Sequence, residues 1–179
     1  MKYQNEGGPD LAQCFDLVRR VTRPSAPQVL RLLDYVIFNA LIGNHDAHAK
    51  NFSLLYAGET PALAPFYDTL STAVYPALAP KMAMKIGSKY KFSEVQARHW
   101  DQFAEGAGLA KTQAKRRILE LAKSLPPTAR KLQSDPGRGF AGNAVVEQFI
   151  ALIEQRCALT IRRLTDSAAD GEESTAPSF

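Results

Sequence analysis

Long apolar runs and cysteine-rich patterns are both missing from this sequence. No run of about eighteen apolar residues occurs, and a membrane-spanning helix requires at least that length. Met1 is followed by the polar stretch KYQNEGG, which lacks the apolar centre of a secretory signal. Cys14 and Cys157 do not have the spacing of a metal site, and we expect free thiols in a reducing compartment. These absences predict a cytoplasmic protein without membrane contacts.

Recognisable phosphate-binding loops are absent as well. Neither GxxxxGKS/T nor GxGxxG occurs anywhere in the 179 residues. Basic stretches interleaved with aromatic residues, which are typical of proteins that stack nucleic-acid bases, do not occur either. We therefore predict no direct binding of nucleic acid by this chain.

Charge is unevenly distributed between the body of the chain and its carboxy-terminal end. The net charge is +4, but the segment 166–179, which reads DSAADGEESTAPSF, contains four acidic residues and no lysine or arginine. The remaining 22 basic and 14 acidic residues leave a body of charge +8. Such a body can attract a nucleotide or an acidic protein surface, although a merely solvated basic face is commoner. We expect one domain over residues 1–165 and a disordered acidic tail over residues 166–179.

Apolar residues recur mainly at helical spacing. The pattern predicts helices over about residues 11–21, 25–42, 93–104, 112–125 and 143–164. Between the second and third of these, NFSLLY, the turn AGET and the returning segment 61–66 indicate a short hairpin, and KMAMKIG alternates enough for a further short strand. The expected fold is mainly α with a small β-hairpin.

Helix ends are predicted from capping residues, glycine and proline. Ser25 with Gln28 and Ser93 with Gln96 have the spacing of a capping box, which favours a helix start at each serine. The remaining signals are helix stops: Gly43 and Asn44 for the second helix, and Pro126 and Pro127 for the fourth.

The stretch NHDAHAKNFSLLYAGETPALAPFYD, residues 44–68, has the residues that phosphoryl transfer requires. Asp46 can accept or orient the proton of an attacking hydroxyl, while Asn51 and Asp68 offer hard oxygen ligands for magnesium beside a triphosphate. Four residues separate Asp46 from Asn51, as in kinase catalytic loops. The hairpin would bring Asn51 and Asp68 together at its open end, and Lys50 would neutralise phosphate charge.

Each of these residues also has an ordinary alternative. Asp46 and Asn51 could be turn residues that cap local backbone groups, and Lys50 could be a solvated surface residue. Tyr67 could flank a nucleotide or belong to the core. A third interpretation is a zinc or iron site at His45, Asp46 and His48. The remaining histidine, His99, is distant in the sequence and no cysteine is near, which argues against that site.

Two motifs resemble a known family. HDAHAKNFS and LAPFYDTLS resemble the catalytic loop and metal-binding segment of the HipA-like serine/threonine kinases, the toxins of bacterial toxin and antitoxin pairs. KYQNEGGP and KMAMKIG also resemble segments of that family, and the resemblance extends to about residue 160. It implies the C-terminal lobe of a protein-kinase-like fold that uses ATP with Mg²⁺. The implied roles are catalysis by Asp46, magnesium binding by Asn51 and Asp68, and nucleotide contacts from these two and from His48, Lys50 and Tyr67.

The resemblance also implies a substrate and partners. Members of the family phosphorylate a serine or threonine of a protein, with aminoacyl-tRNA synthetases among the targets, and thereby arrest growth. They bind a DNA-binding antitoxin. The family has an N-terminal lobe with a phosphate-covering loop and a nucleotide lysine, and this sequence is expected to begin where that lobe ends. The alternative function is therefore a catalytically incompetent lobe that binds an antitoxin or a separate N-terminal lobe polypeptide.

Overall fold

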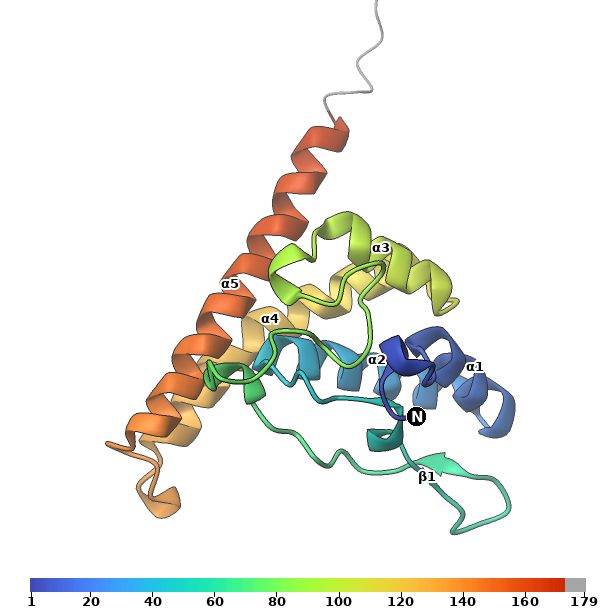
Figure 1. The fold of residues 1–179 in the computed structure, drawn as a ribbon, viewed down its shortest axis with the longest axis horizontal. Coiled ribbons are helices and arrows are strands. Elements are labelled where there is room, and N and C mark those ends of the chain that lie inside the picture. Colours follow the sequence, from blue (N-terminus) through green and yellow to red (C-terminus); the bar gives the residue numbers. More distant parts are fainter. Residues whose placement is uncertain (173–179) are drawn as a thin grey trace, which may run out of the picture.

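The computed structural model describes residues 1–172 and confirms a mainly helical fold with one small hairpin (Figure 1). The helices are α1 (Leu11–Val21), α2 (Ser25–Ile42), α3 (Ala97–Gly106), α4 (Lys111–Ser134) and α5 (Ala144–Glu172). Strands β1 (Leu54–Leu55) and β2 (Ala62–Leu63) pair antiparallel, with Leu54 opposite Leu63. Short 3-10 turns cover Gln4–Glu6, Ala49–Asn51, Thr72–Val74, Phe92–Glu94 and Pro136–Arg138. None of the helices in residues 1–172 has the length and apolar character needed to cross a membrane.

Helix α2 is the centre of the core. Its side chains Leu32, Leu33, Ile37 and Leu41 are fully buried because α1, α4 and α5 surround it. Burial of each such side chain contributes about 1.5–3 kcal/mol relative to exposure. The long helices α4 and α5 lie side by side, and α5 forms one edge of the molecule in Figure 1. The buried face of this central helix fixes the position of the loop that follows it.

Gly43 ends α2 as the sequence predicted. Its φ of +79° is left-handed, and a Cβ atom there would lie 2.7 Å from Ala73 Cβ and 2.8 Å from a methyl group of Leu152. Both the backbone conformation and the close packing therefore require glycine. The chain turns sharply here and enters the segment that contains Asp46.

The two predicted capping boxes are wrong. Helix α2 begins after Pro24 without a side-chain cap, because the Gln28 side-chain oxygen accepts the Leu63 N–H at 3.0 Å instead. Helix α3 begins at Ala97, four residues later than expected, and its cap is Gln96, whose N–H donates to His99 Nδ1 at 2.8 Å. Ser93 lies in a 3-10 turn. A tertiary contact thus uses the Gln28 side chain that the spacing had assigned to a cap, and in α3 the cap lies at Gln96 instead of Ser93.

The prediction that Pro126 and Pro127 end the fourth helix is also wrong. Both prolines lie inside α4, which continues to Ser134. Each proline removes one helical hydrogen bond, a loss of about 3 kcal/mol in a helix interior. Contacts with α5 offset this loss, and Arg130 beyond the prolines forms ion pairs of 2.7 Å with both Glu147 and Glu154 of α5.

The segment KMAMKIG does not form the expected strand. Its main chain is instead bonded to loops: Met82 N–H donates to Tyr90 O at 2.8 Å, Ala83 N–H donates to His45 O at 2.8 Å, and Gln4 N–H donates to Ala83 O at 3.1 Å. The alternating pattern reflects burial of Met82 and Met84 rather than pairing in a sheet. The segment thereby joins the amino end of the chain to the loop after α2.

The structure differs from the sequence expectation at the carboxy-terminal end. Helix α5 continues to Glu172, so the first seven residues of the expected disordered tail 166–179 are helical. The rest of that tail, residues 173–179, lies outside the described residues.

Candidate functional site

A buried amide, Asn44, links the segments that form the candidate site. Its side-chain nitrogen donates to Asn39 Oδ1 at 2.9 Å and to the main-chain oxygen of Asp68 at 3.0 Å. Its side-chain oxygen accepts the N–H of Asp46 at 3.1 Å. One side chain thus uses both donors and its acceptor to join α2, the Asp46 loop and the Asp68 segment. Sequence reasoning assigned Asn44 only to a helix stop.

Asn51 and Asp68 lie in contact, as the predicted hairpin required. Asn51 Nδ2 donates to Asp68 Oδ2, and Asn51 Oδ1 accepts the His48 N–H at 2.9 Å. Asn51 is buried, whereas Asp68 is exposed. Within residues 1–172, Asp68 is the one non-glycine residue with a positive φ, at +55°. Such a backbone conformation costs about 1–3 kcal/mol, and residues that adopt it cluster at functional sites.

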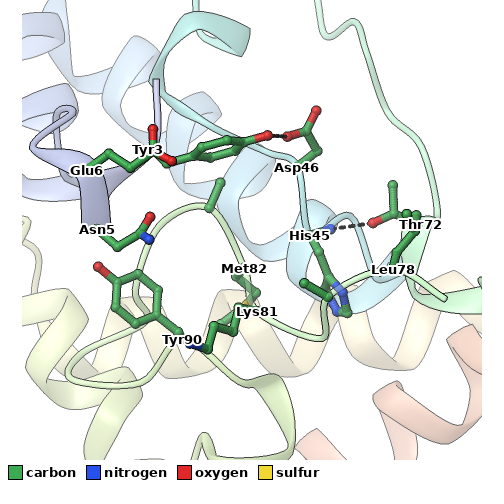
Figure 2. Close-up of a pocket in the computed structure, with 12 residues that line it drawn as sticks. Tyr3, Asn5, Glu6, His45, Asp46, Thr72, Leu78, Lys81, Met82 and Tyr90 are labelled. Atoms are coloured by element: carbon green, nitrogen blue, oxygen red, sulfur yellow. Dashed lines mark hydrogen bonds between the residues drawn. The ribbon is translucent and has the colours of Figure 1, made fainter. Parts of the chain in front are cut away.

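The amino-terminal segment reaches Asp46. The Tyr3 hydroxyl donates to Asp46 Oδ1 at 2.7 Å (Figure 2). Lys2 Nζ lies 3.7 Å from the same oxygen. The Asp46 side chain remains 44% exposed, so a ligand can still approach it. Sequence reasoning missed Tyr3 and Lys2 because no local pattern links them to a loop more than forty residues away.

The other predicted nucleotide contacts differ in their surroundings. Lys50 is exposed. Tyr67 is 41% exposed rather than part of the core, and its hydroxyl lies 2.7 Å from Lys50 O and 2.7 Å from Ser53 Oγ. His48 is buried, packs edge-on against Tyr3 at 5.8 Å between ring centres, and has no hydrogen-bond partner at Nδ1. Of these three, Lys50 and Tyr67 are accessible to a ligand and His48 is largely enclosed.

His45 does not join Asp46 and His48 in a metal cluster. Residues 1–172 contain no group of three or more His, Cys, Asp or Glu side chains that could hold a metal ion. Burial and then the charge of Arg156 lower the pKa of His45 below its usual 6.5, which favours the neutral imidazole. The structure thus gives no support to the zinc or iron interpretation.

Arg156 contributes to the lowered pKa of His45 and also supports the end of α2. It is 9% exposed, its Nε donates to Ala40 O at 2.8 Å, and its guanidinium lies 3.7 Å from the centre of the Phe92 ring. Ala40 belongs to the last turn of α2, where a cation interacts favourably with the helix dipole. Burial lowers the pKa of Arg156 to about 10, so the side chain is cationic at neutral pH.

The side chains of Asn51 and Asp68 carry oxygen atoms of the kind that magnesium binds. Mg²⁺ is usually held by one or two carboxylates, while substrate phosphates and water complete its coordination. Asp68 has an exposed carboxylate, to which the Asn51 side-chain nitrogen donates, while the Asn51 side-chain oxygen accepts the His48 N–H and keeps a second lone pair. This donor set consists of oxygen atoms, which hard cations prefer.

A cavity of about 520 Å³ lies beside Asp46. Its walls come from the amino-terminal segment, the loop after α2, and the segments around Leu78, Met82 and Tyr90 (Figure 2). Asp46 lines this cavity, whereas Asn51 and Asp68 do not. The cavity therefore borders Asp46 but not the Asn51–Asp68 pair.

Comparison with curated proteins finds kinase-like relatives. A protein named "Putative kinase Y4mE" from Sinorhizobium fredii is 42% identical over 158 residues, which cover 88% of this chain and 38% of that protein. The serine/threonine-protein kinase toxin HipA of Shewanella oneidensis is 27% identical over 119 residues, which cover 66% of this chain and 27% of HipA. This chain thus spans well under half the length of either relative.

A solved structure and a family description point the same way. The structure of Shewanella oneidensis HipA in complex with HipB and operator DNA matches 89% of this chain and 37% of the HipA chain, with a TM-score of 0.76 at 22% identity. At this identity the match shows a shared fold. The model of the HipA-like C-terminal domain matches residues 1–129, well over half of the chain. The chain therefore belongs to the family of HipA-like C-terminal domains.

Proposed function

We propose that this chain is the catalytic lobe of a HipA-like serine/threonine protein kinase, which transfers the γ-phosphoryl group of ATP to a protein hydroxyl. The observation that carries the proposal is the direct contact between Asn51 and Asp68, with Asp46 tied to the same framework by Asn44. The kinase relatives support the reaction type. A growth-arresting role and an aminoacyl-tRNA synthetase substrate belong to the same proposal.

The side chains have separate tasks in this reaction. The oxygen of the acceptor hydroxyl forms a bond to the γ-phosphorus, and Asp46 receives the proton of that hydroxyl. The bond from the γ-phosphorus to the β–γ bridging oxygen breaks, and ADP leaves. Asn51 and Asp68 would hold Mg²⁺, which when bound neutralises charge on the phosphate oxygens. Lys50 and Tyr67 lie at the exposed surface beside them, where Lys50 adds positive charge.

The test compares Mg-ATP binding by the wild-type chain and the Asp68→Ala variant in calorimetric titrations. We expect binding by the wild type that disappears in the variant, because the carboxylate ligand is lost. Asp46→Asn should keep nucleotide binding but lose transfer to purified aminoacyl-tRNA synthetases supplied with radiolabelled ATP. Equal binding by wild type and Asp68→Ala, or full transfer by Asp46→Asn, would contradict the assignment.

A second candidate is a binding module that needs another polypeptide for catalysis. The matched residues cover 38% of one kinase relative and 27% of HipA. In kinases the nucleotide is held by groups from two lobes, so one lobe alone forfeits several contacts. A folded wild-type chain that shows no Mg-ATP binding at millimolar nucleotide would favour this candidate. Binding of a HipB-like antitoxin, the kind of partner present in the matched complex, would be its positive test.

A further inference from the structure

The cavity beside Asp46 has no assigned ligand. It borders the carboxylate proposed to receive the acceptor proton, and Lys50, Asn51 and Asp68, which form the proposed nucleotide side, do not line it. A molecule in the cavity would therefore border Asp46 rather than the residues proposed to hold the nucleotide. In phosphoryl transfer the acceptor and the leaving group lie roughly in line on opposite sides of the phosphorus.

A hydroxyl group already reaches Asp46 from within this cavity. Tyr3 lines the cavity, and its hydroxyl donates to Asp46 Oδ1 at 2.7 Å. Figure 2 shows the Tyr3 ring extending to the carboxylate, with Asn5 and Tyr90 toward one side and His45 and Leu78 toward the other. The Tyr3 hydroxyl occupies one oxygen of the carboxylate, and the Asp46 side chain is 44% exposed, so an acceptor hydroxyl in the cavity would bond to the other oxygen or replace Tyr3.

The walls of the cavity favour apolar groups. Their carbon surface comes from Leu78, Met82, Ala83 and the rings of Tyr3 and Tyr90. The Leu78 residue is 51% exposed. Apart from Asp46, the charged side chains that line the cavity are Glu6 and Lys81, one of each sign. The volume of about 520 Å³ lies within the range of about 300–1,000 Å³ that is typical of ligand sites. An apolar side chain would gain more here than an acidic or a basic one.

We propose that this cavity binds the acceptor segment of the protein substrate and selects a bulky apolar side chain within two residues of the phosphorylated serine or threonine. The inference rests on the proposed function and adds to it the chemical class of the acceptor. Because an extended chain advances only about 3.3–3.6 Å per residue, such a side chain lies within about 7 Å of backbone from a hydroxyl at Asp46.

The probe is a set of short acetylated peptides with a central serine, in which leucine, aspartate or lysine replaces glutamine at one position at a time. Affinity for the purified chain is measured by fluorescence anisotropy. A leucine within two residues of the serine should strengthen binding about tenfold or more relative to aspartate at the same position, because it buries most of an apolar side chain. Equal affinities, or no binding of any peptide to the folded chain, would overturn the inference.

Two variants test whether the preference for leucine arises in the cavity. Leu78→Asp places a carboxylate in the cavity wall and should reduce the leucine preference to about threefold or less. Leu17→Asp is the matched control, because Leu17 is similarly exposed, at 43% against 51%, but lies on α1 and does not line the cavity. It should keep the full preference. A preference that survives in Leu78→Asp, or that is lost equally in both variants, would contradict the assignment of the cavity.

Nucleotide titrations separate this inference from the proposed function. Asp68→Ala should abolish Mg-ATP binding and leave the leucine preference intact. If the wild-type chain shows the preference and Asp68→Ala does not affect nucleotide binding, the proposed function fails and the peptide site stands. If Leu78→Asp instead abolishes Mg-ATP binding while peptide affinities stay unchanged, the cavity holds the nucleotide and the inference is wrong.

Discussion

The side-chain amide of Asn44 holds the main-chain carbonyl of Asp68 at 3.0 Å, across 24 positions in the sequence. The side-chain oxygen of Asn44 accepts the Asp46 N–H, so one buried residue bonds to the main chain of both aspartates that the proposed reaction needs. This relation makes Asn44 a positioning residue that need not touch a substrate.

Asn44→Ala should therefore reduce both stability and ligand binding. The substitution leaves the Asn39 side-chain oxygen and the Asp68 carbonyl without their donor, which should lower the free energy of unfolding by about 1–3 kcal/mol. Urea denaturation measures this loss, and calorimetry should show weaker Mg-ATP binding. Asn143→Ala is the control, because Asn143 caps the start of α5 through the N–H groups of Val145 and Val146, away from the site. Mg-ATP binding weakened equally by both variants would contradict a positioning role.

Gly43→Ala should destabilise the chain strongly. Alanine is strained at a φ of +79°, and its Cβ would meet Ala73 and Leu152 at less than 3 Å. We expect a loss of about 1 kcal/mol or more in the free energy of unfolding. Gly58→Ala is a matched control in the hairpin turn, since a Cβ there has no neighbour within 4 Å. Thermal denaturation followed by circular dichroism compares the two, and equal midpoints would refute the packing argument.

Replacing a proline in α4 should stabilise the chain, in contrast to Gly43→Ala. Pro126→Ala restores a helix-forming residue within a continuous helix, so the free energy of unfolding should rise by up to about 3 kcal/mol, less a few tenths to 1 kcal/mol from the more flexible unfolded chain. Pro80→Ala, in an exposed loop, keeps only the unfolded-state effect and should be neutral or slightly destabilising. Destabilisation by Pro126→Ala would indicate that α4 ends at the prolines.

Acid should destabilise the fold through His45. Its pKa is below 6.5 in the folded chain, so between the two pKa values the unfolded state binds more protons than the folded state. Stability is therefore fully present above about pH 6.5 and is lost as the pH falls through the folded pKa. Urea denaturation at pH 7.5 and pH 5.5 should show a smaller pH difference for His45→Gln than for the wild type.

We expect His99 to contribute to the pH dependence of stability that remains in His45→Gln. Its pKa is also lowered, first by burial, and its Nδ1 accepts the Gln96 N–H at 2.8 Å, a bond that protonation would break. The double variant His45→Gln with His99→Gln should show the least pH dependence between pH 7.5 and 5.5. An unchanged pH dependence in both variants would refute this explanation.

Local patterns predicted the parts of the site that are close in sequence. The hairpin between Asn51 and Asp68 brought its ends together because a short antiparallel turn has few alternatives. The bond from Tyr3 to Asp46 had no such signal, since 43 positions separate the residues and the contact depends on how the whole amino-terminal segment packs.

The predictions of helix caps and helix ends were wrong for a related reason. The side chain of Gln28 could have capped its own helix, but β2 offers it a partner in Leu63. Pro126 and Pro127 would end an isolated helix, but α5 supports the continuation of α4 through Arg130. Propensity describes the chain alone, and in these places packing between distant elements outweighed it.

The contact of Lys2 and Tyr3 with Asp46 has a consequence for how the protein is handled. A purification tag attached ahead of Met1 would be joined to the chain about two residues, or some 7 Å of extended backbone, from the side chains that touch the carboxylate. Such a tag would lie close to the contact between Tyr3 and Asp46. Binding measurements should therefore use chains from which any amino-terminal tag has been cleaved.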